Sequence, residues 1–295
     1  MRIVVTGGGG FVGRALVNAL DGHDVVAVDT DLRGRPGVEG DLCDHEILAC
    51  AFAQGCDAVV HLATVPGGAA EADPALAKRI NLDATMALIE TAANTGARPR
   101  FVFASSIAVL GDSLPPLIDD ATPLAPRMIY GAHKAMMEQW IGLQTRRGAI
   151  SGVSLRLPGI VARPRAPSGM KSAFMSDVFH ASASGEALVL PVSCGATMWL
   201  MSVERVVANL AHALAIEATG SITLPALRVS MAELVAAITR ATGTDPGLIT
   251  YQPDPVLEAG FGRQPLLITP CADALGFVPD KSLADLVGSA LGTLG

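Results

Sequence analysis

A tyrosine and a lysine lie four residues apart in the stretch Tyr130-Gly131-Ala132-His133-Lys134. On a helix, this spacing places the phenol and the ammonium on the same face. A free tyrosine titrates near pKa ~10, so acting as a base near neutrality requires a decrease of roughly 3 units, or about 4 kcal/mol. A neighbouring ammonium works in that direction. The pair predicts a proton-transfer role for Tyr130, tuned by Lys134, with a surface pair at chance spacing as the alternative.

Two serines end a short apolar run that is typical of a strand. Ser105 and Ser106 close the predicted strand 101–105. In open parallel sheets, ligands gather at the carboxyl ends of the strands. A hydroxyl there can hold a substrate oxygen and share its proton with a tyrosine, and one of the two serines is expected only to satisfy backbone groups. His61, at the end of the predicted strand 58–62, is expected to be structural.

Four consecutive glycines begin the segment Gly7–Gly13, which lies between an apolar strand and an amphipathic helix. Glycine permits the unusual φ angles of a tight turn and lets bare backbone approach a pyrophosphate. The following helix directs its free N–H groups toward that anion. Asp29 closes the next strand, where a carboxylate binds a ribose 2′-hydroxyl and repels a 2′-phosphate. The pattern predicts NAD as the cofactor; NADP, through Arg33 or Arg35, is the less favoured alternative.

The acidic residue in Asp41-Leu42 has two interpretations of equal weight. Asp41 precedes the predicted helix 44–54, where its carboxylate could contact the adenine amino group of the cofactor. Alternatively, Asp41 or Asp44 caps that helix.

Apolar runs of strand length alternate with amphipathic stretches through the first half of the chain. This alternation predicts an α/β fold, a Rossmann-type doubly wound parallel sheet with helices on both faces. The strands are expected at 3–6, 24–29, 58–62, 101–105 and 152–157, and the helices at 11–20, 44–54, 74–96 and 130–147.

From Arg163 onward the alternation stops, and Pro164, Pro167 and Gly169 break the pattern. We therefore expect an NAD-binding domain over 1–163 and a smaller, mainly substrate-binding region over 164–295. A stretch at about 199–222 is expected to return to the first domain. Shorter elements are expected at 172–184, 187–191, 203–217, 230–240 and 282–291.

The composition excludes several classes of protein. Of the 295 residues, 50% are hydrophobic and 17% are charged, which is too apolar for a disordered chain. The net charge of −7 disfavours binding to nucleic acid, where phosphate attraction dominates. No apolar run reaches the roughly 18 residues that a membrane span requires. A strand predicted from Arg2 leaves no room for a signal peptide, so we expect a cytoplasmic protein.

The cysteines are odd in number and lack the spacing of metal ligands, so no metal site is expected. They are expected to be buried small hydrophobes or incidental thiols. They are Cys43, Cys50, Cys56, Cys194 and Cys271.

Together these motifs resemble the extended short-chain dehydrogenase/reductase family, also called the NAD-dependent epimerase/dehydratase family. The matching stretches, in the family's order, are TGGGGFVG, VDTD, GDLCD, HLAT, INLDAT, FASSIAVLG, YGAHK and SLRLPGIVARP. The resemblance implies that Tyr130 is the general base, that Lys134 tunes it and holds the nicotinamide ribose, and that Ser106 binds the reacting oxygen. Ser106 is preferred to Ser105 because it lies three residues before Val109.

The resemblance also implies sets of binding residues. The implied cofactor-binding residues are Gly7, Gly10, Phe11, Val12, Gly13, Asp29, Asp41, Leu42, Leu62, Ala63, Asn81, Tyr130, Lys134, Pro158 and Ile160. The implied substrate-binding residues are Ser106, Tyr130, Gly67, Arg163 and His180.

The chain departs from the family pattern on the substrate side. Gly67 lies in a predicted loop where a serine is usual, and His180 replaces a usual arginine. A guanidinium is the natural partner of a carboxylate, and Arg163, Arg165 or Lys171 could supply one instead.

The C-terminal half is similar to family members that oxidise a small sugar acid at C2, which makes such an NAD-dependent oxidation the first hypothesis. A nucleotide-sugar epimerase or dehydratase is the alternative, although Gly159 occupies the position of that group's asparagine. A non-catalytic dinucleotide-binding regulator is the third, and it is disfavoured because Tyr130 and Lys134 are both retained. The family resemblance implies a homodimer formed through the helices around 82–95 and 130–147.

Overall fold

The computed structural model describes residues 1–95, 98–165 and 172–294 of the chain. The chain forms two compact units, each described here by itself. Unit 1 comprises Met1–Val109, Pro126–Arg156 and Val207–Thr223. Unit 2 comprises Leu110–Ala125, Leu157–Val206 and Leu224–Gly295. The assignment of one region to the cofactor and another to the substrate stays a prediction.

A seven-stranded sheet forms the centre of unit 1, with the strand order β11-β7-β5-β4-β1-β2-β3. The pairs that β1 forms with β2 and β4 are parallel, as are β4–β5, β2–β3 and β7–β11. The strands are β1 (Arg2–Thr6), β2 (Asp24–Asp29), β3 (Val38–Glu39), β4 (Ala58–His61), β5 (Arg100–Ser106), β7 (Ser151–Leu157) and β11 (Gly220–Thr223). This doubly wound order confirms the Rossmann-type fold, and it reverses direction between β1 and β4.

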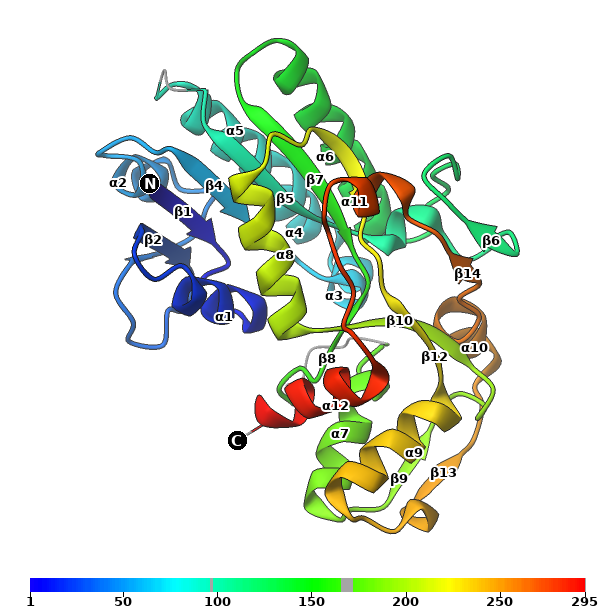
Figure 1. Cartoon of the computed structure of the whole chain (residues 1–295). Coiled ribbons are helices and arrows are strands. Elements are labelled where there is room, and N and C mark those ends of the chain that lie inside the picture. Colours follow the sequence, from blue (N-terminus) through cyan, green and yellow to red (C-terminus); the bar gives the residue numbers. More distant parts are fainter. Residues whose placement is uncertain (96–97, 166–171, 295) are drawn as a thin grey trace. The chain divides into compact units, whose positions relative to one another are not determined.

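Helices cover both faces of this sheet, which explains why its strands are continuously apolar. Figure 1 shows α1 (Phe11–Ala19) and α8 (Val203–Ala215) in front of the sheet. On the other face, α2 (His45–Ala51), α5 (Thr85–Ala93) and α6 (Ile129–Arg146) pack against the strands. The core of that face includes Leu48, Leu88, Phe101, Phe103, Met137 and Ile141.

Unit 2 contains three small sheets, and α7, α9 and α12 pack into its main core. The sheets are β12 (Leu227–Ser230) with β10 (Thr197–Ser202) and β8 (Gly159–Val161), β13 (Ile249–Tyr251) with β9 (Leu188–Leu190), and β14 (Leu266–Leu267) with β6 (Leu117–Ile118). The helices are α7 (Phe174–Ser184), α9 (Met231–Thr242), α10 (Pro255–Phe261), α11 (Pro270–Ala274) and α12 (Leu283–Gly292). The core includes Phe179, Leu200, Leu234, Ile238 and Leu286.

Several details of the expected elements are wrong. The single helix expected at 74–96 is α4 (Pro74–Lys78), a π-helical turn (Arg79–Ala84) and α5, and Gly96 lies outside the described residues. The short helix α3 (Gly67–Ala72) replaces the expected loop around Gly67, because its alanine-rich sequence favours a helix.

Of the two expectations for the cysteines, burial holds for Cys56 alone, and the other four are free thiols. The others lie on outer helix surfaces and turns, where a thiol remains accessible. Cys43 is half-buried, and Cys50, Cys194 and Cys271 are exposed. Among the described residues, no helix is long and apolar enough to cross a membrane. Within the same residues, no three His, Cys, Asp or Glu side chains gather into a possible metal site.

Candidate active site

The glycine-rich loop after β1 lies directly against the end of β4. Gly7 has φ +74°, and a Cβ on it would lie 2.7 Å from the amide nitrogen of Ala63. Its own N–H donates to the carbonyl of Val28 at 2.8 Å, which ties the loop to β2. Only glycine combines this backbone angle with this approach. The loop is therefore fixed at the point where the strand order reverses.

The same loop offers bare backbone at the start of α1. A Cβ on Gly13 would lie 2.0 Å from the carbonyl oxygen of Gly7, and one on Gly9 would lie 1.9 Å from that of Asp31. The helix begins at Phe11 after an extended Gly10 that provides no side-chain cap. Its first N–H groups lack partners within the helix and favour an anion. This cradle fits the pyrophosphate of a dinucleotide.

Asp29 lies beside that cradle at the end of β2. One carboxylate oxygen accepts the N–H of Gly9 at 2.9 Å, and the other accepts the N–H of Asp31 at 3.4 Å. Arg35 is directed elsewhere, because its guanidinium donates to the side chain of Asn18 at 3.2 Å. The half-buried Asp29 carboxylate fits the predicted ribose contact, which stays a prediction.

Asp41 does not cap the following helix. Asp44 is the N-cap of α2, with its side chain accepting the N–H of Glu46. Asp41 accepts the N–H of Cys43 at 2.9 Å and lies 3.4 Å from the guanidinium of Arg79. The hydrogen bond from the Cys43 backbone, opposed by partial burial, keeps the pKa of Asp41 below its usual value. The adenine contact stays a prediction.

Asn81 is buried on the π-helical turn and binds the loop that follows β4. Its side-chain oxygen accepts the Val65 N–H at 2.7 Å and the Thr64 hydroxyl at 3.0 Å. Its amide donates to the Val65 carbonyl at 3.0 Å. The predicted support for the cofactor site would therefore act through this loop, which begins next to Leu62 and Ala63.

The first turn of α6 places Tyr130 next to the segment that follows β5. A Cβ on Gly131 would lie 2.4 Å from the carbonyl oxygen of Ala108, so only glycine permits this approach. The hydroxyl of Ser106 accepts the N–H of Ala108 at 3.1 Å. On the other side, the carboxylate of Glu71 accepts the N–H of Ile129 at 2.7 Å. The structure thus brings the segments that carry Ser106 and Tyr130 together.

Lys134 is buried one helical turn after Tyr130. Its ammonium donates to the carbonyl of Ala104 at 2.7 Å and lies 4.4 Å from the ring centroid of Phe103. The same nitrogen lies 5.6 Å from the ring centroid of Tyr130. Burial lowers the pKa of Lys134 to about 7, and the negative charge of Glu138 opposes this decrease. The predicted pair is therefore assembled on one face of α6.

The two serines at the end of β5 have different roles. Ser105 is buried, and its hydroxyl donates to the carboxylate of Glu138 at 2.5 Å. Ser106 is half-buried at the strand end. The serine expected to satisfy only backbone groups is therefore not Ser105, which binds a side chain, whereas Ser106 accepts a backbone N–H.

His61 is structural, as expected. Its ring nitrogens lie 2.6 Å from the hydroxyl of Thr6 and 2.8 Å from that of Thr85. Burial, with the nearby charge of Lys134, lowers the pKa of His61 to about 3, so the ring is neutral. No local pattern singles out Thr85 or Glu71 in the sequence. Glu138 was detectable by its helical spacing from Lys134.

Arg163 and His180 lie together within unit 2. A ring nitrogen of His180 is 2.7 Å from the carbonyl oxygen of Arg163. The N–H of Arg163 donates to the hydroxyl of Ser176 at 3.0 Å, and its guanidinium donates to the carbonyl of Ile160 at 3.3 Å. Pro158 separates β7 from β8, and Lys171 lies outside the described residues. Substrate binding by Arg163, His180 and Gly67 stays a prediction.

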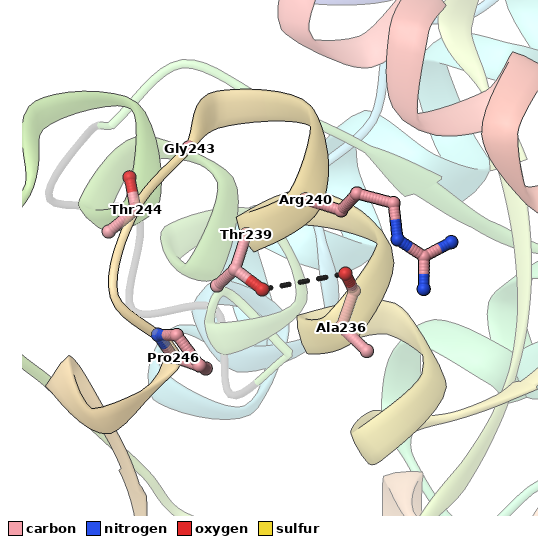
Figure 2. A pocket seen from close by; sticks show the side chains of 6 residues that line it. All are labelled: Ala236, Thr239, Arg240, Gly243, Thr244 and Pro246. Atoms are coloured by element: carbon pink, nitrogen blue, oxygen red, sulfur yellow. Dashed lines mark hydrogen bonds between the residues drawn. The ribbon is translucent and has the colours of Figure 1, made fainter.

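None of these residues lines the surface hollow of about 350 Å³ at the carboxyl end of α9. Figure 2 shows the Thr239 hydroxyl directed back toward the carbonyl of Ala236, at 3.4 Å. The lining residues are Ala236, Thr239, Arg240, Gly243, Thr244 and Pro246. They include no acid–base pair, so this hollow is not the candidate active site.

Residues 3–221 match the NAD-dependent epimerase/dehydratase family. The chain is 37% identical to D-erythronate dehydrogenase of Cupriavidus necator, over 97% of both proteins. It is 32% identical to D-erythronate dehydrogenase of Haemophilus influenzae, over 82% of this chain and 83% of the relative. The crystal structure of a nucleoside-diphosphate-sugar epimerase from Agrobacterium tumefaciens superposes with a TM-score of 0.87 at 28% identity, covering 99% of this chain and 96% of that one.

The chain belongs to the NAD-dependent epimerase/dehydratase family. It is an NAD-dependent oxidoreductase of the extended short-chain dehydrogenase/reductase type, and its cofactor is NAD. The glycine cradle and the buried lysine beside a tyrosine agree with that class.

Proposed function

We propose that the chain oxidises the C2 hydroxyl of a small polyhydroxy acid resembling D-erythronate, with NAD as the oxidant. The observation that carries the chemistry is the Lys134 ammonium, buried 5.6 Å from the ring centroid of Tyr130. The substrate class is supported by the D-erythronate dehydrogenase relative, which matches along 97% of both chains.

In this proposal, Tyr130 is the general base. Its phenolate takes the proton of the substrate hydroxyl, and the Ser106 hydroxyl holds the same oxygen by a hydrogen bond. The positive charge of Lys134 favours the phenolate form. When bound, NAD accepts the hydride from the carbon that carries the hydroxyl. The substrate thereby loses a proton and a hydride and becomes a ketone.

The glycine cradle would hold the cofactor's pyrophosphate, and Asp29 would bind the adenosine ribose. Lys134 would also hold the nicotinamide ribose. The other proposed cofactor contacts are Gly7, Gly10, Phe11, Val12, Gly13, Asp41, Leu42, Leu62, Ala63, Asn81, Pro158 and Ile160. The proposed substrate contacts, in addition to Ser106 and Tyr130, are Gly67, Arg163 and His180.

A nucleotide-sugar epimerase or dehydratase is the second candidate. It is favoured by the likeness to the nucleoside-diphosphate-sugar epimerase from Agrobacterium tumefaciens, at 28% identity over 99% of this chain. Ile107 and Ala108 follow Ser106, however, where a dehydratase needs an acid–base pair.

A homodimer through α5 and α6 is also proposed, and the cytoplasm is the proposed location. Met136 on α6 is 53% exposed. The indole N–H of Trp140, on the same helix, is buried without a hydrogen-bond partner among the described residues. A second copy covering this face would bury Met136. Solution scattering gives the mass, and a monomer would refute the dimer.

The test of the function is NADH absorbance with a panel of substrates. We expect NADH to form with four-carbon aldonates and NAD, and not with UDP- or dTDP-sugars. The chain has two tyrosines, so Tyr251→Phe is a matched control for Tyr130→Phe. No turnover of any aldonate or uronate would contradict the proposal, and thermal stabilisation by a nucleotide sugar would favour the second candidate.

A further inference from the structure

Glu138 is a buried carboxylate that the proposed reaction does not use. It lies one helical turn after Lys134, which itself lies one turn after Tyr130, so the three share one face of α6. Its side chain is 0% exposed. A buried carboxylate is costly unless it is paired and hydrogen-bonded, so its partners indicate what holds it there.

Two strands of unit 1, β5 and β7, bond to this carboxylate of α6. One oxygen accepts the hydroxyl of Ser105 from β5 at 2.5 Å and the Nε–H of Arg156 from β7 at 3.0 Å. The other oxygen accepts Nη2 of Arg156 at 2.8 Å. Nη1 of Arg156 lies 3.5 Å from the hydroxyl of Thr223 on β11. The fork of two parallel bonds fixes the orientation of the carboxylate as well as its charge.

The anchored serine lies between two residues of the candidate site. Ala104, just before Ser105, supplies the carbonyl that accepts the Lys134 ammonium at 2.7 Å. Ser106, just after it, carries the hydroxyl proposed to hold the substrate oxygen. Successive side chains of a strand point to opposite faces. Anchoring Ser105 to α6 therefore sets both neighbouring groups relative to Lys134.

Among the described residues, the titratable groups around Lys134 come from α6, β4 and β7. On its own helix, Tyr130 and Glu138 flank it; from β4, the neutral His61 faces it. Arg156, from β7, is paired with Glu138. Burial lowers the pKa of Lys134, and the negative charge of Glu138 opposes this decrease.

We propose that Glu138 is a positioning residue that fixes the end of β5 against α6 and places a negative charge one helical turn from the Lys134 ammonium. This role rests on the proposed function, because Lys134 matters only if it acts with Tyr130 in that reaction. It is measured, however, as the pKa of Lys134 in the protein without substrate or cofactor. No catalytic contact is assigned to Glu138 itself.

The test is a titration of Lys134 by NMR. The chain contains four lysines, so ¹³C-labelling of lysine gives a simple spectrum, and Lys134→Arg assigns one resonance. In the unmodified protein, the midpoint is expected at about 7. Glu138→Gln keeps the shape and an acceptor oxygen but removes the charge. We expect the midpoint to fall by about one unit or more, the usual effect of losing a close opposite charge.

Two further variants keep the test decisive. Ser105→Ala removes the hydrogen bond but keeps the charge, so the midpoint should change by much less than in Glu138→Gln. The double variant Glu138→Gln with Arg156→Met leaves no unpaired buried charge, which protects folding. It should lower the midpoint by less than Glu138→Gln alone, because the positive charge of Arg156 is lost as well. A midpoint in folded Glu138→Gln and in the double variant that equals the unmodified value would overturn the proposal.

The failure of this role is distinguishable from failure of the proposed function. If aldonates are oxidised but the midpoint is insensitive to Glu138, the positioning role is wrong and the reaction stands. If the midpoint falls as expected but no aldonate is oxidised, the effect of Glu138 on the pKa of Lys134 stands and the substrate assignment is wrong.

Discussion

The carboxyl edge of the sheet in unit 1 and the segment around Arg163 and His180 in unit 2 hold their polar groups differently. At the sheet edge, Lys134 and Glu138 are buried, and each has a short hydrogen bond to β5. In unit 2, Arg163 and His180 are half-buried, and His180 contacts the backbone of Arg163. The first arrangement suits fixed acid–base chemistry, whereas the second leaves its side chains partly exposed, as the proposed substrate contact requires.

The largest effect expected from this contrast comes from the phenol. Tyr130→Phe removes the proposed base without changing the volume of the side chain appreciably. We expect kcat/KM for the aldonate to fall by about 10²–10⁴-fold, the usual contribution of general-base catalysis. Steady-state NADH formation measures this, with Tyr251→Phe retaining activity. Near-normal turnover by Tyr130→Phe would remove the phenol from the mechanism.

The buried lysine predicts a pH-dependent stability. The pKa of Lys134 is about 7 in the folded protein against an ordinary value of 10.5, so the unfolded chain binds the extra proton between these values. The stability of the unmodified protein therefore rises with pH through that window. The cost of burying Lys134 is full below about pH 7 and is lost by pH 10.5.

Lys134→Met should remove this dependence. At pH 6, the free energy of unfolding of Lys134→Met should exceed that of the unmodified protein by several kcal/mol, as an order of magnitude. Near pH 10.5, little of this difference should remain. Urea unfolding at several pH values measures the difference. A difference independent of pH would show that Lys134 is not held in a buried, charge-disfavouring site.

The features of the fold and of the candidate site that can be predicted from the sequence are those set by residues close together in the chain. The pairing of Tyr130 with Lys134 is predictable because helical spacing is a local pattern, and both lie on one face of α6. The choice of Ser106 over Ser105 came from the family resemblance and stays a prediction. The pairing of Leu117 with Leu266 was not predictable, because two-residue strands carry no periodic signal and their partners are far apart in sequence.

The errors of interpretation have similar causes. Gly67 is expected in a loop because the family pattern has one after the HLAT stretch, yet Gly67 begins α3. The π-helical turn that carries Asn81 was not expected, because apolar spacing alone does not distinguish it from an α-helix.

A smaller effect is expected at Asn81. Asn81→Ala leaves the Val65 N–H and carbonyl without their side-chain partners, which should cost about 1–3 kcal/mol. Denaturant unfolding measures the loss, and NAD affinity should weaken because the loop after β4 loosens. Asn94→Ala, at an exposed position at the end of α5, is the control and should change neither quantity. Equal losses in both variants would assign the effect to the helix and not to the loop.

The smallest effect is expected in unit 2. His180→Ala removes a single hydrogen bond to the Arg163 carbonyl, worth about 0.5–1.5 kcal/mol, or roughly 2–13-fold. We expect this change in KM for the acid with kcat nearly retained. Steady-state kinetics measures it, with Ser184→Ala, at an exposed position on the same helix α7, as the control. A large loss of kcat would place His180 with the chemistry and erase the contrast between the two regions.

Deuterium transfer tests the central claim most directly. The unmodified protein is incubated with NAD and D-erythronate deuterated at C2, and the reduced cofactor is analysed by mass spectrometry. One deuterium in the reduced nicotinamide is the predicted result, because the hydride comes from the carbon whose hydroxyl proton passes to Tyr130. Reduced cofactor without deuterium, or no reduced cofactor at all, would contradict the account.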